Sequence, residues 1–440
     1  MVKSLEKLQK EFQKVNPKSF NEWERNKKTL PGGVIKGAYF SSPYPIYISK
    51  AEGCKLFDID DKEYTDFSNH HTAMILGHSH PAVIKAVQEA VNNGLALSAP
   101  SILEGKIAHE FIERFPSIEQ IRYTNSGTES SITAARMVRA ITGKSKIAKF
   151  AGNYHGFNDS LEFNLAVSPN STSNSEFIEP VPAWSGMPQY GEKNIIILPM
   201  NDPETVEMIV RENKNELAAI FFDGKPGILD IPIEFTKFLR KLTSELGILF
   251  VMDEVISFRS SRTGYQGIAD VIPDISIFGK IVGGGMPVGA IGGATKFMNI
   301  LDNSGPSTGL SQSGTFAGNH VTLAAGLATM QNLTPQVYTH LDQLREKLHN
   351  GIVDIFKNYN IPCKVVSKGS IVNTYLTDKP ITNFEAASAS DKDLWERIML
   401  SLLLKGIYAR DGMGFVLSEP MGVKDIDNLL ENLTYVINEN

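Results

Sequence analysis

The chain has 440 residues, of which 42% are hydrophobic and 21% are charged, and its formal net charge is −6. These values are ordinary for a globular protein and give no reason to expect binding to nucleic acid or to an anionic membrane. The two cysteines, Cys54 and Cys363, lack metal-ligand spacing, so we expect neither a disulfide framework nor a metal site. The charged N-terminus has no signal-peptide core and the longest apolar runs are of strand length, which predicts a cytoplasmic protein without a membrane span.

The first 70 residues are predicted to form helices followed by a small sheet. Residues 1–28 are polar and helix-prone, and Pro31-Gly32-Gly33 ends them. Strand-like stretches separated by turn signals predict an antiparallel sheet, at 45–49, 54–59 and 63–67.

From about residue 80, helical and strand-like patterns alternate. Apolar residues at helical spacing predict helices at 81–91, 102–115, 128–141 and 232–246. Short apolar runs predict strands at 120–124, 146–150, 194–198, 217–222, 248–252 and 274–279. Strands separated by helical crossovers indicate an α/β fold with a mostly parallel sheet covered by helices on both faces.

The last part of the chain is predicted to be an α+β unit. It is helical from about 317 to 350 and then mixed, with strands at 363–367, 371–376 and 407–409 and helices at 391–405 and 423–438. We expect this unit to pack with the N-terminal segment, because neither could bury much apolar surface alone. The predicted divisions are an N-terminal segment at 1–70, a large α/β domain at 71–320 and a small C-terminal domain at 321–440.

Lys280 stands in an unusual place for a lysine. An apolar run ends at Gly279, and Lys280 is followed by Ile-Val and three glycines. A lysine among residues that favour burial has a reason to lose its proton, and a neutral lysine is a nucleophile toward carbonyl groups. The alternative is a lysine at a strand end whose ammonium group reaches water.

Two further motifs supply partners for Lys280. Asp253 follows a buried strand, and ligands of open α/β sheets bind outside the carboxyl ends of strands. The turn Ser126-Gly127-Thr128 opens a helix, whose unpaired N–H groups form a cradle for phosphate. Pyridoxal 5′-phosphate requires three groups of this kind. They are a lysine that forms a Schiff base, an aspartate that keeps the pyridine nitrogen protonated and a cradle for the phosphate.

Tyr154 is a fourth candidate. It lies between Gly152 and Gly156 after a predicted strand, where an aromatic ring can stack on a flat heterocycle. Each of these motifs also has a structural alternative: an ordinary helix N-cap at Ser126–Thr128, a capping acid at Asp253 and a packed loop tyrosine at Tyr154.

A series of short motifs follows in unbroken order between about residues 30 and 330. They are Leu30-Pro31-Gly32-Gly33, Gly77-His78-Ser79-His80-Pro81, Leu103-Glu104-Gly105, Asn125-Ser126-Gly127-Thr128-Glu129, Tyr154-His155-Gly156, Asp253-Glu254-Val255, Phe278-Gly279-Lys280 with the glycine-rich run to Ala290, and Ser313-Gly314-Thr315-Phe316-Ala317-Gly318-Asn319. Together they resemble the class III aminotransferases of pyridoxal-phosphate fold type I. The resemblance is nearest to glutamate-1-semialdehyde aminomutases and β-amino-acid (β-phenylalanine) aminotransferases.

This resemblance implies roles for the candidate residues. Lys280 would hold the cofactor as a Schiff base and later shuttle the proton, and Asp253 would bind the pyridine nitrogen. The other implied contacts are ring packing by Val255 and Tyr154 and phosphate binding by Ser126, Gly127 and Thr128. Thr315 would reach the phosphate of a neighbouring subunit, which implies a homodimer with active sites at its interface.

The chain departs from its relatives where they bind substrate. Lys36 stands near the place of an arginine that grips a substrate carboxylate, and Arg410 is another candidate for that task. After the strand at 217–222, residues 223–226 replace the usual Glu-Pro. The loop at 303–312, rich in glycine and serine, matches a mobile active-site loop in the aminomutases, or is simply a flexible connection.

The sequence is compatible with three functions. The first is an aminotransferase that moves an amino group between an amino acid (α or β) or amine and a keto acid or aldehyde. The second is an aminomutase of the glutamate-1-semialdehyde type, and the third is a catalytically silent binding protein with the same fold. Intact Lys280, Asp253 and Tyr154 argue against the third.

Overall fold

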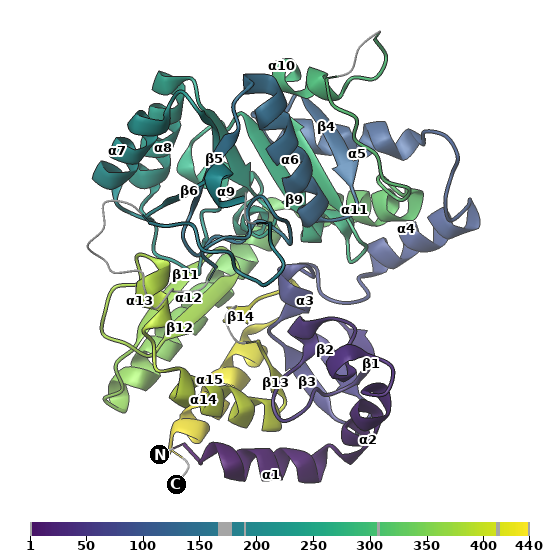
Figure 1. Ribbon diagram of the computed structural model, residues 1–440. Coiled ribbons are helices and arrows are strands. Elements are labelled where there is room, and N and C mark those ends of the chain that lie inside the picture. Colours follow the sequence, from purple (N-terminus) through teal and green to yellow (C-terminus); the bar gives the residue numbers. More distant parts are fainter. Residues whose placement is uncertain (1, 166–177, 189–190, 306–308, 411–413, 439–440) are drawn as a thin grey trace.

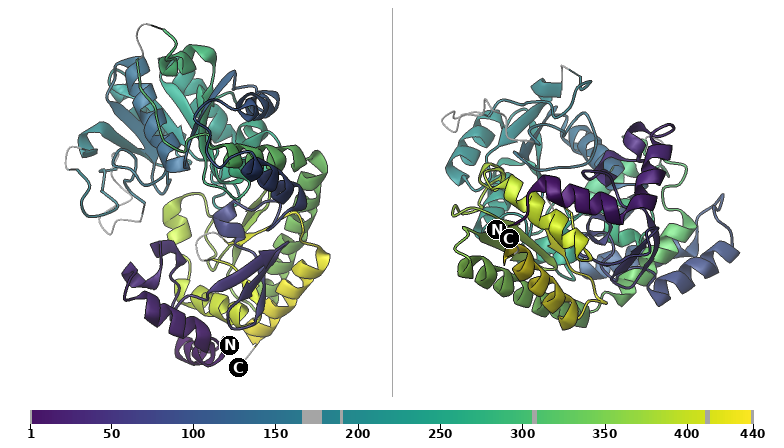
Figure 2. Two further views of the ribbon diagram at one scale, coloured as in Figure 1. Left: turned by 90° about the vertical axis from the view of Figure 1, so that its right-hand side faces the viewer. Right: turned by 90° about the horizontal axis from the view of Figure 1, so that it is seen from below.

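The computed structural model describes residues 2–165, 178–188, 191–305, 309–410 and 414–438. A large α/β part lies above a smaller α+β part, and the two ends of the chain lie close together at the foot of the small part (Figure 1). The same arrangement is seen from the side and from below (Figure 2). The exact divisions at residues 70 and 320 stay a prediction.

The large part is built on a seven-stranded sheet. Its strands, in spatial order, are β4 (Gln120–Thr124), β10 (Gly289–Gly293), β9 (Ile275–Gly279), β8 (Leu249–Asp253), β7 (Leu217–Phe222), β5 (Lys146–Phe150) and β6 (Ile195–Leu198). β10 runs antiparallel to both of its neighbours, and the other pairs are parallel. The predicted mostly parallel sheet is therefore confirmed. β10 was not predicted, because three of its five residues are glycine and glycine is depleted in strands.

Helices cover both faces of this sheet, because successive strand residues point to opposite sides. Phe221 of β7 belongs to a core with Met137 of α6 (Gly127–Thr142). The next residue, Phe222, belongs to a core on the other side with Leu239 of α8 (Ile233–Leu246). The remaining helices of the large part are α4 (Pro81–Asn92), α5 (Ile102–Arg114), α7 (Pro203–Asn213), α9 (Gly264–Ala269), α10 (Thr295–Met298) and α11 (His320–Asn332).

Both ends of the chain build the small part. β1 (Ile48–Glu52), β2 (Lys55–Asp58) and β3 (Glu63–Asp66) form the expected antiparallel sheet, and β13 (Ile407–Tyr408) joins β3 as a parallel strand. Leu8 and Phe12 of α1 (Leu5–Val15) pack with Leu400 of α14 (Lys392–Leu404). The other elements are α2 (Pro17–Asn26), α3 (Asn69–Thr72), α12 (Pro335–Asn358), α13 (Phe384–Ser388), α15 (Val423–Asn438), and the sheet of β11 (Lys364–Lys368), β12 (Ile371–Tyr375) and β14 (Phe415–Val416). Within the described ranges, no helix has both the length and the apolar character needed to span a membrane.

Candidate active site

The register of β10 brings two predicted motifs to the same edge of the sheet. Gly289 lies opposite Thr124 of β4 on one side and opposite Gly279 of β9 on the other. A Cβ atom at Gly289 would lie 2.1 Å from the carbonyl oxygen of Ser126, so only glycine fits there. The start of α6 is thus held beside the end of the strand that leads to Lys280.

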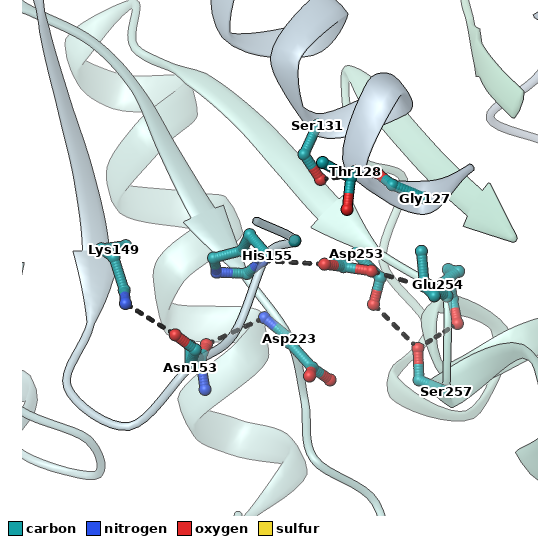
Figure 3. A network of polar contacts seen from close by, with 12 residues as sticks. Gly127, Thr128, Ser131, Lys149, Asn153, His155, Asp223, Asp253, Glu254 and Ser257 are labelled. Atoms are coloured by element: carbon teal, nitrogen blue, oxygen red, sulfur yellow. Dashed lines mark hydrogen bonds and ion pairs between the residues drawn. The ribbon is translucent and has the colours of Figure 1, made fainter. Parts of the chain in front are cut away.

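Asp253 is the last residue of β8 and only 4% of it is exposed. Its Oδ2 lies 2.8 Å from Nδ1 of His155, and its Oδ1 accepts the N–H of Val255 at 2.9 Å (Figure 3). Asp253 pairs with Ile277 of the neighbouring strand β9. The strand end therefore carries a buried, oriented carboxylate next to the strand that precedes Lys280.

Lys280 follows β9 directly, with a left-handed φ of 52°. Burial lowers the pKa of Lys280 to about 8, and the charges of Lys225 and Arg259 act in the same direction. The carboxylates of Asp253 and Asp223 oppose this shift. A substantial fraction of Lys280 is therefore a neutral amine near pH 8, as its apolar flanks indicated.

The start of α6 has the form of an anion cradle. Ser126 is its N-cap, and the Ser126 hydroxyl accepts the N–H of Glu129 at 3.1 Å. Among the described residues, the N–H groups of Gly127 and Thr128 have no hydrogen-bond acceptor. A Cβ atom at Gly127 would lie 3.0 Å from Val255, so the absence of a side chain leaves room between the helix and that valine.

The loop after β5 places Tyr154 and His155 beside the α6 start. The N–H of Phe157 donates to the Thr128 hydroxyl at 3.2 Å, and Tyr154 is 48% exposed in the single chain. His155 is buried, with Nε2 lacking a partner among the described residues. The role of His155 was not predicted, although this residue stands in the Tyr154-His155-Gly156 motif.

A buried lysine, Lys149, holds the loop after β5 by hydrogen bonds. Lys149 is fully buried, and its Nζ donates to the carbonyl oxygens of Asn153 at 2.6 Å and Phe163 at 2.5 Å. Burial lowers the pKa of Lys149 to about 7. The Asn153 side chain in turn accepts the N–H of Asp223 at 3.1 Å, as Figure 3 shows, which ties the loop to the end of β7.

Lys36 and Arg410 form a second group with the histidines of α3. The Lys36 Nζ lies 4.1 Å from the centre of the Tyr39 ring, and that ring lies 6.2 Å from the His71 ring. After burial, the charges of Arg410, Lys36 and Lys280 are among the influences that lower the pKa of His71, to about 4. His71 thus lies within electrostatic reach of both groups of candidate residues.

Comparison with known proteins gives a consistent result. The family model "Aminotransferase class-III" matches residues 38–429. The chain belongs to the class III aminotransferase family. A protein named glutamate-1-semialdehyde 2,1-aminomutase from Methanocaldococcus jannaschii is 36% identical over 396 residues, which are 89% of this chain and 90% of that protein.

Solved structures of class III enzymes match over nearly the whole chain. An omega-transaminase from Sphaerobacter thermophilus has a TM-score of 0.93 and 34% identity, covering 96% of this chain and 97% of the other. A β-phenylalanine aminotransferase from Variovorax paradoxus has a TM-score of 0.86 and 31% identity, covering 98% and 96%. The predicted family, the fold type I architecture and the use of pyridoxal phosphate by an enzyme of this class are confirmed.

The donor set fits the cofactor of class III aminotransferases. A buried carboxylate suits a protonated ring nitrogen, a lysine with a lowered pKa suits an aldehyde, and free N–H groups at a helix start suit phosphate. A Cβ atom at Gly156 would lie 2.7 Å from the Cα atom of Thr128, so this glycine is required for the close approach of the tyrosine loop. Among the described residues there is no group of acids, histidines or cysteines that could hold a metal ion.

The segment 223–226, which was expected to depart from the family pattern, directly follows β7 at the same edge. The Nζ of Lys225 is 3.3 Å from Oδ2 of Asp223, and both side chains are nearly buried. The charges of both residues influence the pKa of Lys280. Asp223 and Lys225 therefore form a nearly buried ion pair whose charges reach Lys280.

Thr315 is placed differently from the other predicted residues. It is exposed in the single chain, on the loop after Gly314. No hydrogen bond within the described part of the chain joins it to Lys280, Asp253 or the α6 start. Of the loop predicted at 303–312, residues 306–308 lie outside the described residues.

Proposed function

We propose that this class III enzyme is an aminotransferase that moves an amino group between an amino acid or amine and a keto acid or aldehyde. The observation that carries the proposal is the pairing of β8 with β9, which brings Asp253 beside the strand that ends directly before Lys280. Adjacent parallel strands fix both side chains on hydrogen-bonded backbone, where a catalytic pair is held firmly.

Each residue has a task in this reaction. When bound, pyridoxal phosphate supplies an electron sink that makes the α-hydrogen of an attached amine acidic. Lys280 is the amine that holds the cofactor and then carries the proton between carbon atoms, for which its pKa of about 8 is suited. Asp253 keeps the proton on the ring nitrogen, and His155 orients this carboxylate.

The remaining contacts position the ring and the phosphate. The Val255 side chain, beside Gly127, would pack on one face of the cofactor ring, and Tyr154 would pack on the other. The α6 N–H groups and the Ser126 and Thr128 hydroxyls bind the phosphate. Lys36 and Arg410 provide the positive charge that attracts the carboxylate of an α- or β-amino acid.

An aminomutase that moves nitrogen within one substrate is the second candidate. It is favoured by the name of the 36% identical relative and by the sequence of the loop at 303–312. Lys36 and the ion pair of Asp223 with Lys225 distinguish this chain from that enzyme's usual motifs. A silent binding protein is disfavoured, because Lys280 and Asp253 both lie at the edge of the sheet.

We further propose a homodimer with active sites at its interface. Large apolar side chains that are exposed in the single chain include Leu95, Ile102, Phe157 and Phe316. The N–H of Phe157 donates to the Thr128 hydroxyl. The Asn319 side chain donates to the carbonyl oxygen of Leu95. A partner subunit would cover these side chains and bring its Thr315 to the phosphate; light scattering should therefore report twice the chain mass. A cytoplasmic location stays a prediction.

The reaction is tested by spectroscopy. Purified protein with pyridoxal phosphate should show the visible absorbance band of the lysine-bound cofactor. Loss of this band with an amino acid, release of a keto product and recovery with a keto acid would support the aminotransferase. Turnover of one substrate without an acceptor would support the aminomutase instead. Absence of the band would contradict both.

A further inference from the structure

The turn that carries His71 has a rare backbone conformation. Residues Asn69–Thr72 (α3) are four consecutive non-glycine residues with left-handed φ values of 48°, 49°, 54° and 74°. Such values are uncommon for single L-residues, and a run of them forms a left-handed turn. Backbone strain of this kind persists where its surroundings enforce it, and it clusters at ligand sites.

The surroundings do enforce this turn. Oδ1 of Asp66 accepts the N–H groups of Ser68 at 2.8 Å and Asn69 at 3.0 Å. The Asn69 side chain donates to the carbonyl oxygen of Val416 in β14 at 2.6 Å. Oδ2 of Asp66 is 2.7 Å from Nε2 of His78. The turn is therefore fixed to strands from both ends of the chain.

The turn directs His71 toward the site. The imidazole is half-buried, and its Nε2 is hidden from solvent without a partner in the described part of the chain. Burial first, and then the charges of Arg410 and Lys36, lower the pKa of His71 to about 4. The free enzyme thus holds a neutral imidazole, which has one N–H donor and one acceptor.

Positive groups predominate around this imidazole. The cationic side chains that act on it are Lys36 from the N-terminal segment, Arg410 after β13 and Lys280 from the large part. The uncharged ring of Tyr39 and the imidazole of His70, whose pKa is lowered by burial, also lie beside it. The carboxylate of Asp66 lies behind His70, already engaged by His78 and two backbone N–H groups. Among the described residues Lys36 has no ion pair, so the group is suited to receive an anion.

Resting on the proposed function, we propose that His71 is a specificity residue, which donates a hydrogen bond from Nε2 to a substrate carboxylate attracted by Lys36 and Arg410. The favoured substrates are then carboxylate-bearing amines, and simple amines are poor. A bound carboxylate offsets the nearby positive charges and accepts from the imidazole, so it raises the pKa of His71. Binding of a carboxylate near pH 6 should therefore draw a proton into the site.

The test uses the pyridoxal-phosphate-loaded enzyme with butanoate as the probe and butanamide as its neutral counterpart. Calorimetry at about pH 6 in two buffers of different ionisation enthalpy measures affinity and proton uptake together. Butanoate, but not butanamide, should bind with proton uptake. His71→Gln keeps a neutral amide donor near the position of Nε2, so it should abolish the proton uptake while weakening butanoate binding only slightly.

Two further variants separate a local effect from loss of the fold. His71→Asn suits a left-handed residue and should also lose the uptake, because asparagine cannot take up the proton. His349→Gln is the matched control: His349 is half-buried on α12, its pKa is also lowered by burial, and it lies outside the site. It should leave both affinity and uptake unchanged.

The outcomes distinguish this inference from the proposed function. If both His71 variants keep the visible cofactor band and bind butanoate with the affinity and uptake of the wild type, the inference is wrong and the aminotransferase stands. If the wild-type protein forms no cofactor band, the proposed function fails, and the inference fails with it.

Discussion

The two sides of the site are built in contrasting ways. On one side Lys280 and Asp253 follow or end neighbouring strands of the large sheet, and Asp253 is almost fully buried. On the other side Lys36 lies on a bend, His71 on the turn of α3 and Arg410 in an isolated β-bridge outside the named strands. The groups for cofactor chemistry therefore rest on or next to rigid hydrogen-bonded strands, whereas the groups for substrate choice lie outside the regular sheets.

The two sides also differ in backbone strain. Lys280 is a single left-handed residue at the strand end, whereas α3 contains four in a row. Each left-handed non-glycine residue costs roughly 1 to 2 kcal/mol of conformational free energy, so the backbone of the substrate side is the more strained. Substitutions at the sheet edge should therefore affect activity most, and substitutions in the turn least.

Lys280→Ala should abolish turnover. Without the amine, the cofactor has no covalent anchor and no group carries the proton, so we expect a loss of more than about 10⁴-fold. Turnover assays and far-UV circular dichroism should show an inactive protein with the fold intact. Lys296→Ala, which changes an exposed lysine, is the matched control and should retain normal turnover.

His155→Phe should weaken the hold on Asp253. The variant keeps a ring in the buried space but loses the contact of 2.8 Å with the carboxylate. We expect kcat/KM to fall about 10- to 100-fold and the cofactor to bind less tightly. Losses of this size are typical when a residue that orients a ligand-binding side chain is removed. His155→Asn keeps a donor near the position of Nδ1 and should recover part of the loss. Equal activity in the phenylalanine variant and the wild type would show that this contact is dispensable.

The sheet edge was predictable because its chemistry follows from local patterns. Each of its three elements can be recognised from a few consecutive residues of the sequence. These elements are the strand that ends in Asp253, the strand that ends before Lys280 and the helix start at Ser126. Parallel strands then place these ends at one edge. β10, which joins the two motifs, was missed because its glycines suit close packing against Ser126 and not strand propensity.

The substrate side was predictable only in part. Lys36 and Arg410 were proposed through the resemblance, but no local pattern indicates that His71 lies near them. Four residues of ordinary type, Asn69–Thr72, adopt left-handed φ values that no local propensity favours. The conformation is imposed by Asp66 and by Val416, which is more than 300 residues away in the chain. Contacts of this kind appear only in the folded structure.

Lys149→Met should change how stability depends on pH. The folded-state pKa of about 7 lies below the unfolded value of about 10.4, so between these values the unfolded chain binds the extra proton. Wild-type stability should therefore rise with pH in this window relative to the variant, by about 1 kcal/mol per pH unit, and the difference should be flat below pH 7.

Urea unfolding of both proteins at a series of pH values checks this slope. Other titrating groups, Lys280 included, are common to the two proteins and cancel in the difference. A constant difference in the free energy of unfolding between about pH 7 and pH 10 would mean that Lys149 keeps an ordinary pKa in the folded protein.

His70→Gly should give the smallest effect, a gain in stability of about 0.5 kcal/mol. The substitution removes the penalty of a left-handed residue at φ 49°, and the larger entropy of glycine in the unfolded chain offsets part of the gain. His70→Val should act in the opposite direction, because a β-branched side chain tolerates this φ poorly. His349→Gly, at a right-handed position inside α12, is the matched control and should lower stability by about 1 kcal/mol. If His70→Gly lowers the unfolding midpoint as much as His349→Gly does, the turn is not strained, and the contrast between the two sides of the site loses its energetic basis.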